Sequence, residues 1–124
     1  MENSRAIDRY LRSILILSEK YFCVRSVDVA HYLGCSKAAV SVALKQLMGE
    51  KLVDAAPDGA LTLTPDGEKR ARQLHERCLY LQRVLTQAGI PQDVAESEAN
   101  NAERALSADS FRRLQVFLAE HGIG

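Results

Sequence analysis

Residues 36–46 combine hydroxyl, amide, methyl and ammonium groups on one face of an expected helix. Val40, Ala43 and Leu44 recur at helical spacing, so the remaining side chains must share the opposite face. These are Ser36, Lys37, Ala38, Ser41, Val42, Lys45 and Gln46. Hydroxyl and amide groups hydrogen-bond to base edges, methyl groups contact thymine, and ammonium groups contact phosphate. The residue types therefore predict a helix that reads double-stranded DNA.

Two cap signals place this helix after another short one. Ser26 is the expected cap of the preceding helix, and Gly34 allows the left-handed backbone that ends it. Ser36 is the expected cap of the second helix, so the pair reads as a helix-turn-helix. Arg25, just before the first helix, is a further candidate for phosphate contact.

A hairpin pattern follows the second helix. Leu52 and Val53 are expected to open one strand, the run 57–59 (Pro-Asp-Gly) has turn chemistry, and residues 61–63 form the returning strand. Thr64 then caps another helix, with Pro65 at its first position. This order predicts a winged helix-turn-helix, and Lys51 in the wing adds a phosphate candidate.

Longer helical patterns flank this motif. We expect helices over residues 4–20, 64–88, 91–106 and 108–121, capped or ended by Gly89, Ser107 and Gly122. Small residues on the 91–106 helix permit close helix approach, and the last helix should bury Phe111, Leu114, Phe117 and Leu118. The fold class is therefore mainly α, with a winged helix-turn-helix domain at 1–70 and a helical domain at 71–124.

An apolar seam runs along the 64–88 helix through Ala71, Leu74, Cys78, Leu81, Leu85 and Ala88. Steps of three and four residues are typical of a helix-packing face. The 71–124 segment carries more apolar surface than a short bundle hides internally, so we expect a homodimer. Packing of the seam within one chain is the alternative.

Composition narrows the class of protein. The 124 residues carry a formal net charge of zero, so DNA affinity must come from local placement of charge and not from general attraction to polyanions. The three cysteines lack a Cys-x-x-Cys pair, so neither a disulfide framework nor a zinc ribbon is indicated. The histidines have no nucleophile pattern beside them, so no enzyme is predicted. No targeting or membrane-spanning segment is evident, and we expect a cytoplasmic protein.

Three strings together resemble the diphtheria toxin repressor and manganese transport regulator family. Residues 8–20 (DRYLRSILILSEK) resemble its first helix, residues 50–71 its wing and following helix, and residues 89–107 its metal-binding and dimerisation segment. The ending at Gly124 resembles the shorter, manganese-type members. The resemblance implies a homodimeric transcriptional repressor that binds operator DNA when loaded with manganese or iron.

The family's metal-ligand positions are mostly lost here. The resemblance puts the first-helix ligands at Arg9 and Arg12, the histidine of the next ligand helix at Cys78, and the remaining ligands at Asn100, Glu103 and Arg104. Of these, Glu103 is the one family ligand retained unchanged. A guanidinium has no lone pair to offer a divalent ion. We therefore expect no intact metal site and no metal cofactor, with Cys78 and Glu103 as remnant positions.

Charge pairing is the expected replacement. Arg9 and Arg104 would supply positive charge to Glu103, with Asp8 or Glu96 as additional partners; Glu96, Asn100 and Glu103 share a helical face. Such a network would make DNA binding metal-independent or leave it to another effector. Solvated surface charges on a decayed site are the plainer alternative.

Three other interpretations stay open. Cys78 and Glu103, with Asp8 or His75, could form a rearranged metal site, although a cysteine in an apolar seam is usually structural. Cys35 precedes a helix N-terminus, where a thiolate is stabilised, so a redox switch is conceivable. The acidic turn at Asp58 would repel phosphate, which favours a protein-interaction module that does not read DNA.

Overall fold

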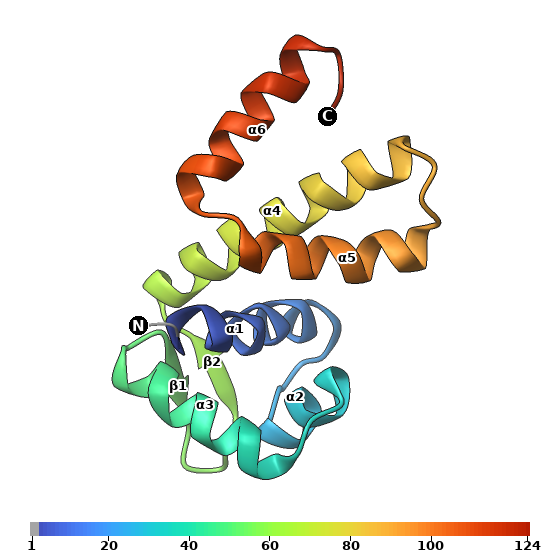
Figure 1. The fold of residues 1–124 in the computed structure, drawn as a ribbon. Helices are drawn as coiled ribbons and strands as arrows, with labels where there is room; N and C mark the ends of the chain where they lie inside the picture. The colour runs from blue at the N-terminus through green and yellow to red at the C-terminus, as the bar shows by residue number, and fades with distance from the viewer. Residues whose placement is uncertain (1–2) are drawn as a thin grey trace. The chain divides into compact units, whose positions relative to one another are not determined.

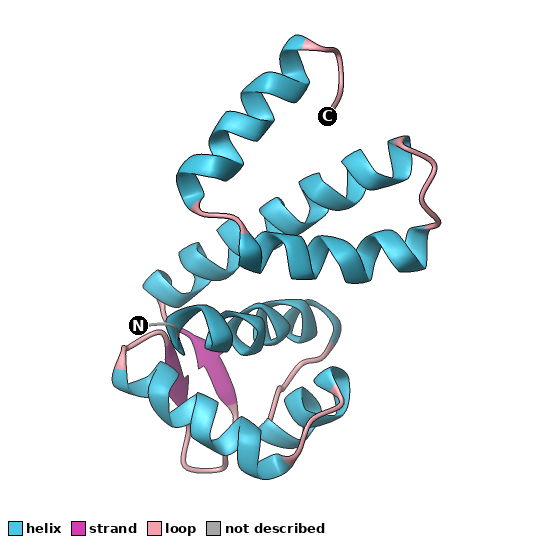
Figure 2. Cartoon of the chain, viewed as in Figure 1, coloured by secondary structure: helices cyan, strands magenta, loops and turns pink. Residues whose placement is uncertain are grey.

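The computed structural model describes residues 3–124, with side chains from residue 7 onward. Over these residues the chain is mainly helical, and the strands are confined to one short hairpin (Figure 2). It divides into two compact units, one ending at Gln73 and one spanning Leu74–Gly124. No described helix is both long and apolar enough to cross a membrane.

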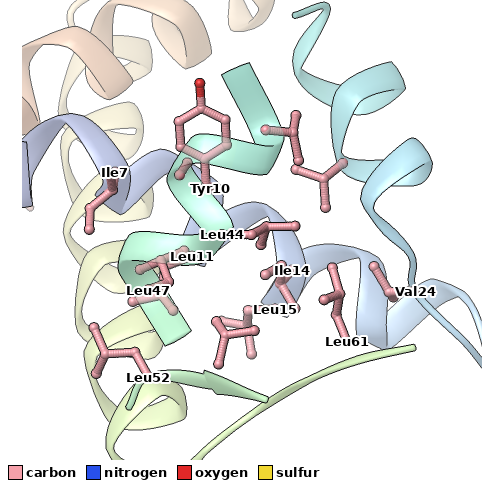
Figure 3. Close-up of a cluster of buried hydrophobic side chains, with 14 of the residues drawn as sticks. Ile7, Tyr10, Leu11, Ile14, Leu15, Val24, Leu44, Leu47, Leu52 and Leu61 are labelled. Atoms are coloured by element: carbon pink, nitrogen blue, oxygen red, sulfur yellow. The ribbon is translucent and has the colours of Figure 1, made fainter. Parts of the chain in front are cut away.

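The first unit is a winged helix-turn-helix. It consists of α1 (Asn3–Lys20), α2 (Ser26–Leu33), α3 (Lys37–Gly49), strands β1 (Val53–Ala55) and β2 (Leu61–Leu63), and the beginning of α4 (Pro65–Gln87) (Figure 1). Figure 3 shows its core, in which Leu11 and Ile14 of α1 lie among side chains from α3 and the hairpin. Both residues are 0% exposed, so the helix-turn-helix and the hairpin pack onto α1.

Most of the predicted boundaries of this unit are confirmed. The Ser36 hydroxyl caps α3 by accepting from the backbone N–H of Ala39 at 3.1 Å, and Gly34 ends α2 with φ +66°. Thr64 caps α4 by accepting from the N–H of Gly67 at 3.0 Å. The predicted cap at Ser26 is wrong, since the N-cap of α2 is Arg25 and Ser26 is already helical. Asp28 takes over the capping function by accepting from the Arg25 N–H at 2.9 Å.

The wing is a two-stranded antiparallel hairpin in which Val53 pairs with Leu63 and Ala55 with Leu61. The predicted start of β1 at Leu52 is one residue early. The Leu52 carbonyl instead accepts from the Thr64 N–H at 3.1 Å, where the wing passes into α4. On its other edge, Leu61 forms an isolated bridge with Val24, which ties the wing to the residue before Arg25.

The second unit contains the rest of α4, then α5 (Gln92–Ala105) and α6 (Ala108–Glu120). Its core is built around Tyr80, Leu81, Ala99 and Phe111, with the Tyr80 and Phe111 rings edge to face at 5.6 Å. Leu81 of the predicted seam therefore packs within the chain. Pro91 is the N-cap of α5 and not its first residue.

One core assignment in the second unit is wrong. Phe117 was expected to be buried, but it is 55% exposed and contacts the ring of His121 at 4.4 Å. Phe111, one of the other predicted core residues on α6, is buried, and Leu114 and Leu118 are partly buried against the same cluster. Because α6 is short, side chains of α4 and α5 cover only part of its apolar face. Its remaining apolar side chains face solvent in the single chain.

Candidate functional site

The exposed face of α3 carries the residues expected to contact bases and phosphates. Ser36, Lys37, Ala38, Ser41, Val42 and Lys45 are exposed, and Gln46 is half-buried. On the opposite side Val40, Ala43, Leu44 and Leu47 are buried. Val42 is 68% exposed even though transfer of a valine side chain out of water is favourable. An exposed face that mixes methyl, hydroxyl and ammonium groups fits the edges of bases in a groove.

Two of these side chains already have partners within the chain. The Ser36 oxygen accepts from Ala39, which leaves its O–H free to donate. The Gln46 amide donates to the Glu50 carboxylate at 3.5 Å. Ser41, Ala38 and Val42 lie on the exposed part of the helix between these positions. Their contact with bases stays a prediction.

Arg25 reaches the tip of the wing. Its Nε donates to the Asp58 carbonyl oxygen at 3.3 Å, and its Nη2 donates to the Asp58 carboxylate at 3.2 Å. The other oxygen of that carboxylate accepts from the Ala60 N–H at 3.0 Å. The two residues are 33 positions apart, so local sequence patterns gave no sign of this pairing. The acidic tip that was expected to repel phosphate is partly neutralised by an arginine.

Lys51 occupies an unusual backbone position at the start of the wing. Its φ is +61°, and its carbonyl oxygen accepts from the Thr64 hydroxyl at 2.7 Å. A lysine with positive φ is uncommon and marks a tight turn. The turn connects α3 directly to the wing and leaves the Lys51 side chain exposed. Its position remains compatible with a phosphate contact.

In the second unit, Glu103 is a buried carboxylate with an arginine partner. The residue is 5% exposed, and its Oε2 lies 3.4 Å from Nη1 of Arg77 on α4. The Arg77 guanidinium also lies over the Phe111 ring, 5.6 Å from its centroid. Sequence reasoning missed Arg77 because 26 residues separate it from Glu103. The sequence offered one signal for this pair, since Arg77 is a basic residue directly before the family ligand position at Cys78.

The other family ligand positions in this unit have different surroundings. Arg104 is exposed and donates to the Asn101 side chain at 2.7 Å instead of pairing with Glu103. Asn100 is half-buried, Cys78 is 4% exposed, and Glu96 is exposed. Adjacent residues of a helix point in different directions, which explains why Arg104 donates to Asn101, three positions earlier, and not to its neighbour Glu103.

The first-helix positions belong to the other unit. Arg9 is exposed, donates from Nη2 to the Tyr10 hydroxyl at 3.2 Å, and lies 4.9 Å from the centroid of the Tyr10 ring. Asp8 is 9% exposed and lies 2.7 Å from Nη2 of Arg70 on α4. Arg12 is half-buried. The predicted pairing of Arg9 with Glu103 stays a prediction.

Candidate metal and thiol chemistry has little support in the described part of the chain. Among residues 3–124, no cluster of three or more histidine, cysteine, aspartate or glutamate side chains could hold a metal ion. In the described part of the chain Cys23, Cys35 and Cys78 form no disulfide, and Cys35 is half-buried. The donor set around Glu103 includes a guanidinium, which repels a divalent cation.

Comparison with known proteins agrees with this architecture. The sequence profile of the iron dependent repressor metal binding and dimerisation domain matches residues 64–121. The transcriptional regulator MntR of Escherichia coli is 30% identical over 116 residues, which cover 94% of this chain and 75% of MntR. The diphtheria toxin repressor of Corynebacterium glutamicum is 29% identical over 108 residues, covering 86% of this chain and 47% of that protein.

Solved structures show the same fold. A manganese-dependent transcriptional repressor in complex with manganese is 28% identical and superimposes with a TM-score of 0.81 over 91% of this chain. The manganese regulator SloR is 27% identical with a TM-score of 0.79, also over 91% of this chain. The aligned regions cover 52% and 53% of those two chains, so this chain spans about half their length.

Proposed function

Because the chain belongs to the family of manganese- and iron-dependent transcriptional regulators that includes MntR and the diphtheria toxin repressor, we propose that it is a homodimeric repressor that binds operator DNA without a divalent metal ion. Members of this family are transcriptional regulators and not enzymes. A protein that acts on chromosomal DNA works in the cytoplasm of a bacterial or archaeal cell, which is the location we propose.

DNA reading is supported chiefly by the exposed face of α3. This face is held on a buried core and presents Ala38, Ser41 and Val42 between Lys37 and Lys45. In a winged helix-turn-helix the second helix enters the major groove, while flanking residues contact phosphate. We assign base contact to Ala38, Ser41 and Val42, and phosphate contact to the two lysines, with Arg25 and Lys51 in support.

Metal independence is supported by the Arg77–Glu103 pair. Glu103 is the retained family ligand, and a buried carboxylate needs a positive partner to remain charged. Arg77, at 3.4 Å, supplies a positive charge that is part of the chain. We propose that this pair takes over the stabilising role that a cation has in the family. The DNA-binding form would then be constitutive or controlled by another signal.

Dimerisation is supported by apolar side chains of the second unit that the single chain leaves exposed. Leu79, Val94, Val116, Phe117 and Ile123 are between 38% and 55% exposed. Large apolar residues on a small helical unit commonly mark a subunit interface. In a two-fold dimer, two copies of α3 could enter successive major grooves roughly 34 Å apart on a palindromic site.

The test begins with selection of bound fragments from genomic DNA, followed by mobility shift with manganese, iron or a chelator. We expect a palindromic motif and an affinity that none of these additions changes. Lys45→Ala should weaken binding to all sequences and lower the salt slope by about one, whereas Ser41→Ala should change the preferred bases. Lys69→Ala, which removes an exposed lysine of α4, is the matched control and should change neither property.

A protein-interaction module is the second candidate, because the wing carries Asp54 and Asp58 and the chain has no net charge. Failure to select any DNA motif at low salt would favour this candidate. Motif selection that requires manganese or iron would instead show that a metal site exists, for which Cys78 and Glu103 are the first residues to examine.

A further inference from the structure

We infer that Asp58 is a positioning residue for DNA binding, which holds the Arg25 guanidinium so that its free edge faces a phosphate beside the wing. This inference rests on the proposed DNA-binding function. It assigns to an acidic residue of the wing a role opposite to the one that its charge suggests.

Asp58 contacts Arg25 through two acceptor groups. Both the carbonyl oxygen and the carboxylate of Asp58 accept from Arg25, through Nε at 3.3 Å and Nη2 at 3.2 Å. An arginine has five N–H donors in a planar fork, and these contacts use the Nε side of the fork. The Nη1 end of the guanidinium is left for another acceptor. The Arg25 side chain is 46% exposed, so that end can be reached from solvent.

Asp58 and Arg25 are both held in place by further hydrogen bonds of their own. The Asp58 carboxylate also accepts from the Ala60 N–H at 3.0 Å, which sets its orientation in the turn. The Arg25 backbone is the N-cap of α2, and its N–H donates to Asp28 at 2.9 Å. The neighbouring Val24 is bridged to Leu61 of β2. A flexible arginine side chain is thereby restrained at the junction of α2 and the wing.

The junction of α2 and the wing lies where a bound DNA backbone is expected. When the second helix of such a motif lies in the major groove, the first helix and the wing meet the phosphate backbone on either side. Arg25 is the N-cap of α2 and its side chain contacts Asp58 at the wing tip, so it lies where these two elements meet. Holding a long side chain in its bound conformation before association lowers the entropic cost of the contact.

The experiment compares Asp58→Asn with the wild type on the selected DNA motif. Asparagine keeps an oxygen that can accept from Ala60, but its amide group cannot accept from Arg25. By charge alone, removing a carboxylate from a DNA-facing surface should tighten binding. The inference predicts the opposite sign, with affinity about fivefold weaker, because Arg25 loses the carboxylate half of its restraint and keeps only the bond from Nε to the backbone carbonyl oxygen. Arg25→Gln should weaken binding at least as much and lower the salt slope by about one.

Two controls separate positioning from general damage to the wing. Asp54→Asn removes an exposed carboxylate from β1 of the same wing and should bind as tightly as the wild type or more tightly. In the Arg25→Gln background, Asp58→Asn should cause no further loss. A persistent loss in that background would mean that Asp58 acts only through wing structure, and it would overturn the inference.

The outcomes also distinguish this inference from the proposed function. If the wild type selects a motif but Asp58→Asn binds it equally well or more tightly, the positioning role is wrong and the DNA-binding function stands. If the wild type selects no motif at low salt, the DNA-binding function is wrong and the positioning role falls with it.

Discussion

At the scale of single residues, Arg77 and Glu103 form an ion pair in the second unit whose carboxylate is buried. Glu103 is 5% exposed, so removal of a cationic partner 3.4 Å away leaves a carboxylate poorly solvated. We expect Arg77→Met to lower the free energy of unfolding by about 1–3 kcal/mol, measured by urea denaturation. The added substitution Glu103→Gln should recover part of this loss, because no buried charge then remains.

The matched control for this prediction is Arg113→Met on α6. Arg113 pairs with Asp109 at 2.8 Å, but its side chain is 79% exposed, and such surface pairs contribute little. Its substitution should change the free energy of unfolding by less than about 0.5 kcal/mol. If both arginine variants lost the same free energy of unfolding, the buried Arg77–Glu103 pair would be no more stabilising than a surface pair.

At the scale of elements, the junction between the wing and α4 depends on one glycine. A Cβ at Gly67 would overlap the backbone carbonyl oxygen of Leu52 and lie 2.8 Å from its carbonyl carbon. Backbone atoms cannot move aside as a side chain does, so Gly67→Ala should cost about 2–4 kcal/mol in thermal or urea unfolding. Gly49→Ala is the control, since nothing lies within 4 Å of its Cβ position, and it should stabilise the last turn of α3 by about 0.5–1 kcal/mol.

The same scale shows what the sequence can predict. Caps and periodicity predicted the Ser36 and Thr64 caps, the Gly34 terminator and the buried face of α3, because each is set by residues within one or two turns. The partners of Arg25, Glu103 and Asp8 could not be predicted, because side chains 33, 26 and about 60 positions apart meet only after folding. The solvent exposure of Phe117 likewise depends on how much of α6 the neighbouring helices cover. Local patterns therefore identified the helix-turn-helix and the wing, whereas the charge partners could be found only from the folded structure.

At the scale of the whole molecule, the assembly prediction concerns the exposed side of the second unit. Phe117 is 55% exposed in the single chain, and Leu81 is 6% exposed in its own core. Phe117→Arg should therefore disrupt a dimer while the monomer stays folded, since an unpaired charge in an apolar interface costs several kcal/mol. Leu81→Arg should instead unfold the second unit. Analytical ultracentrifugation with circular dichroism distinguishes the two results, and a wild type that is monomeric at micromolar concentration would contradict the assembly.

The last prediction concerns the response of the whole protein to metal. With guanidinium groups at family ligand positions and Arg77 on Glu103, the wild type should show no thermal shift with manganese or iron. A variant in which donor side chains are restored should gain such a thermal shift. It carries Arg9→Asp, Arg12→Glu, Cys78→His, Asn100→Glu and Arg104→His, together with Arg77→Ala to remove the arginine partner of Glu103. Binding to the folded state alone stabilises by about 2.7 kcal/mol at a hundred times the dissociation constant, so the shift should grow with ion concentration. Adding Glu103→Ala to this variant should abolish the shift. A wild type already stabilised by micromolar manganese, iron or zinc would contradict replacement of the ion by arginines and would point to a rearranged site using Cys78 and Glu103.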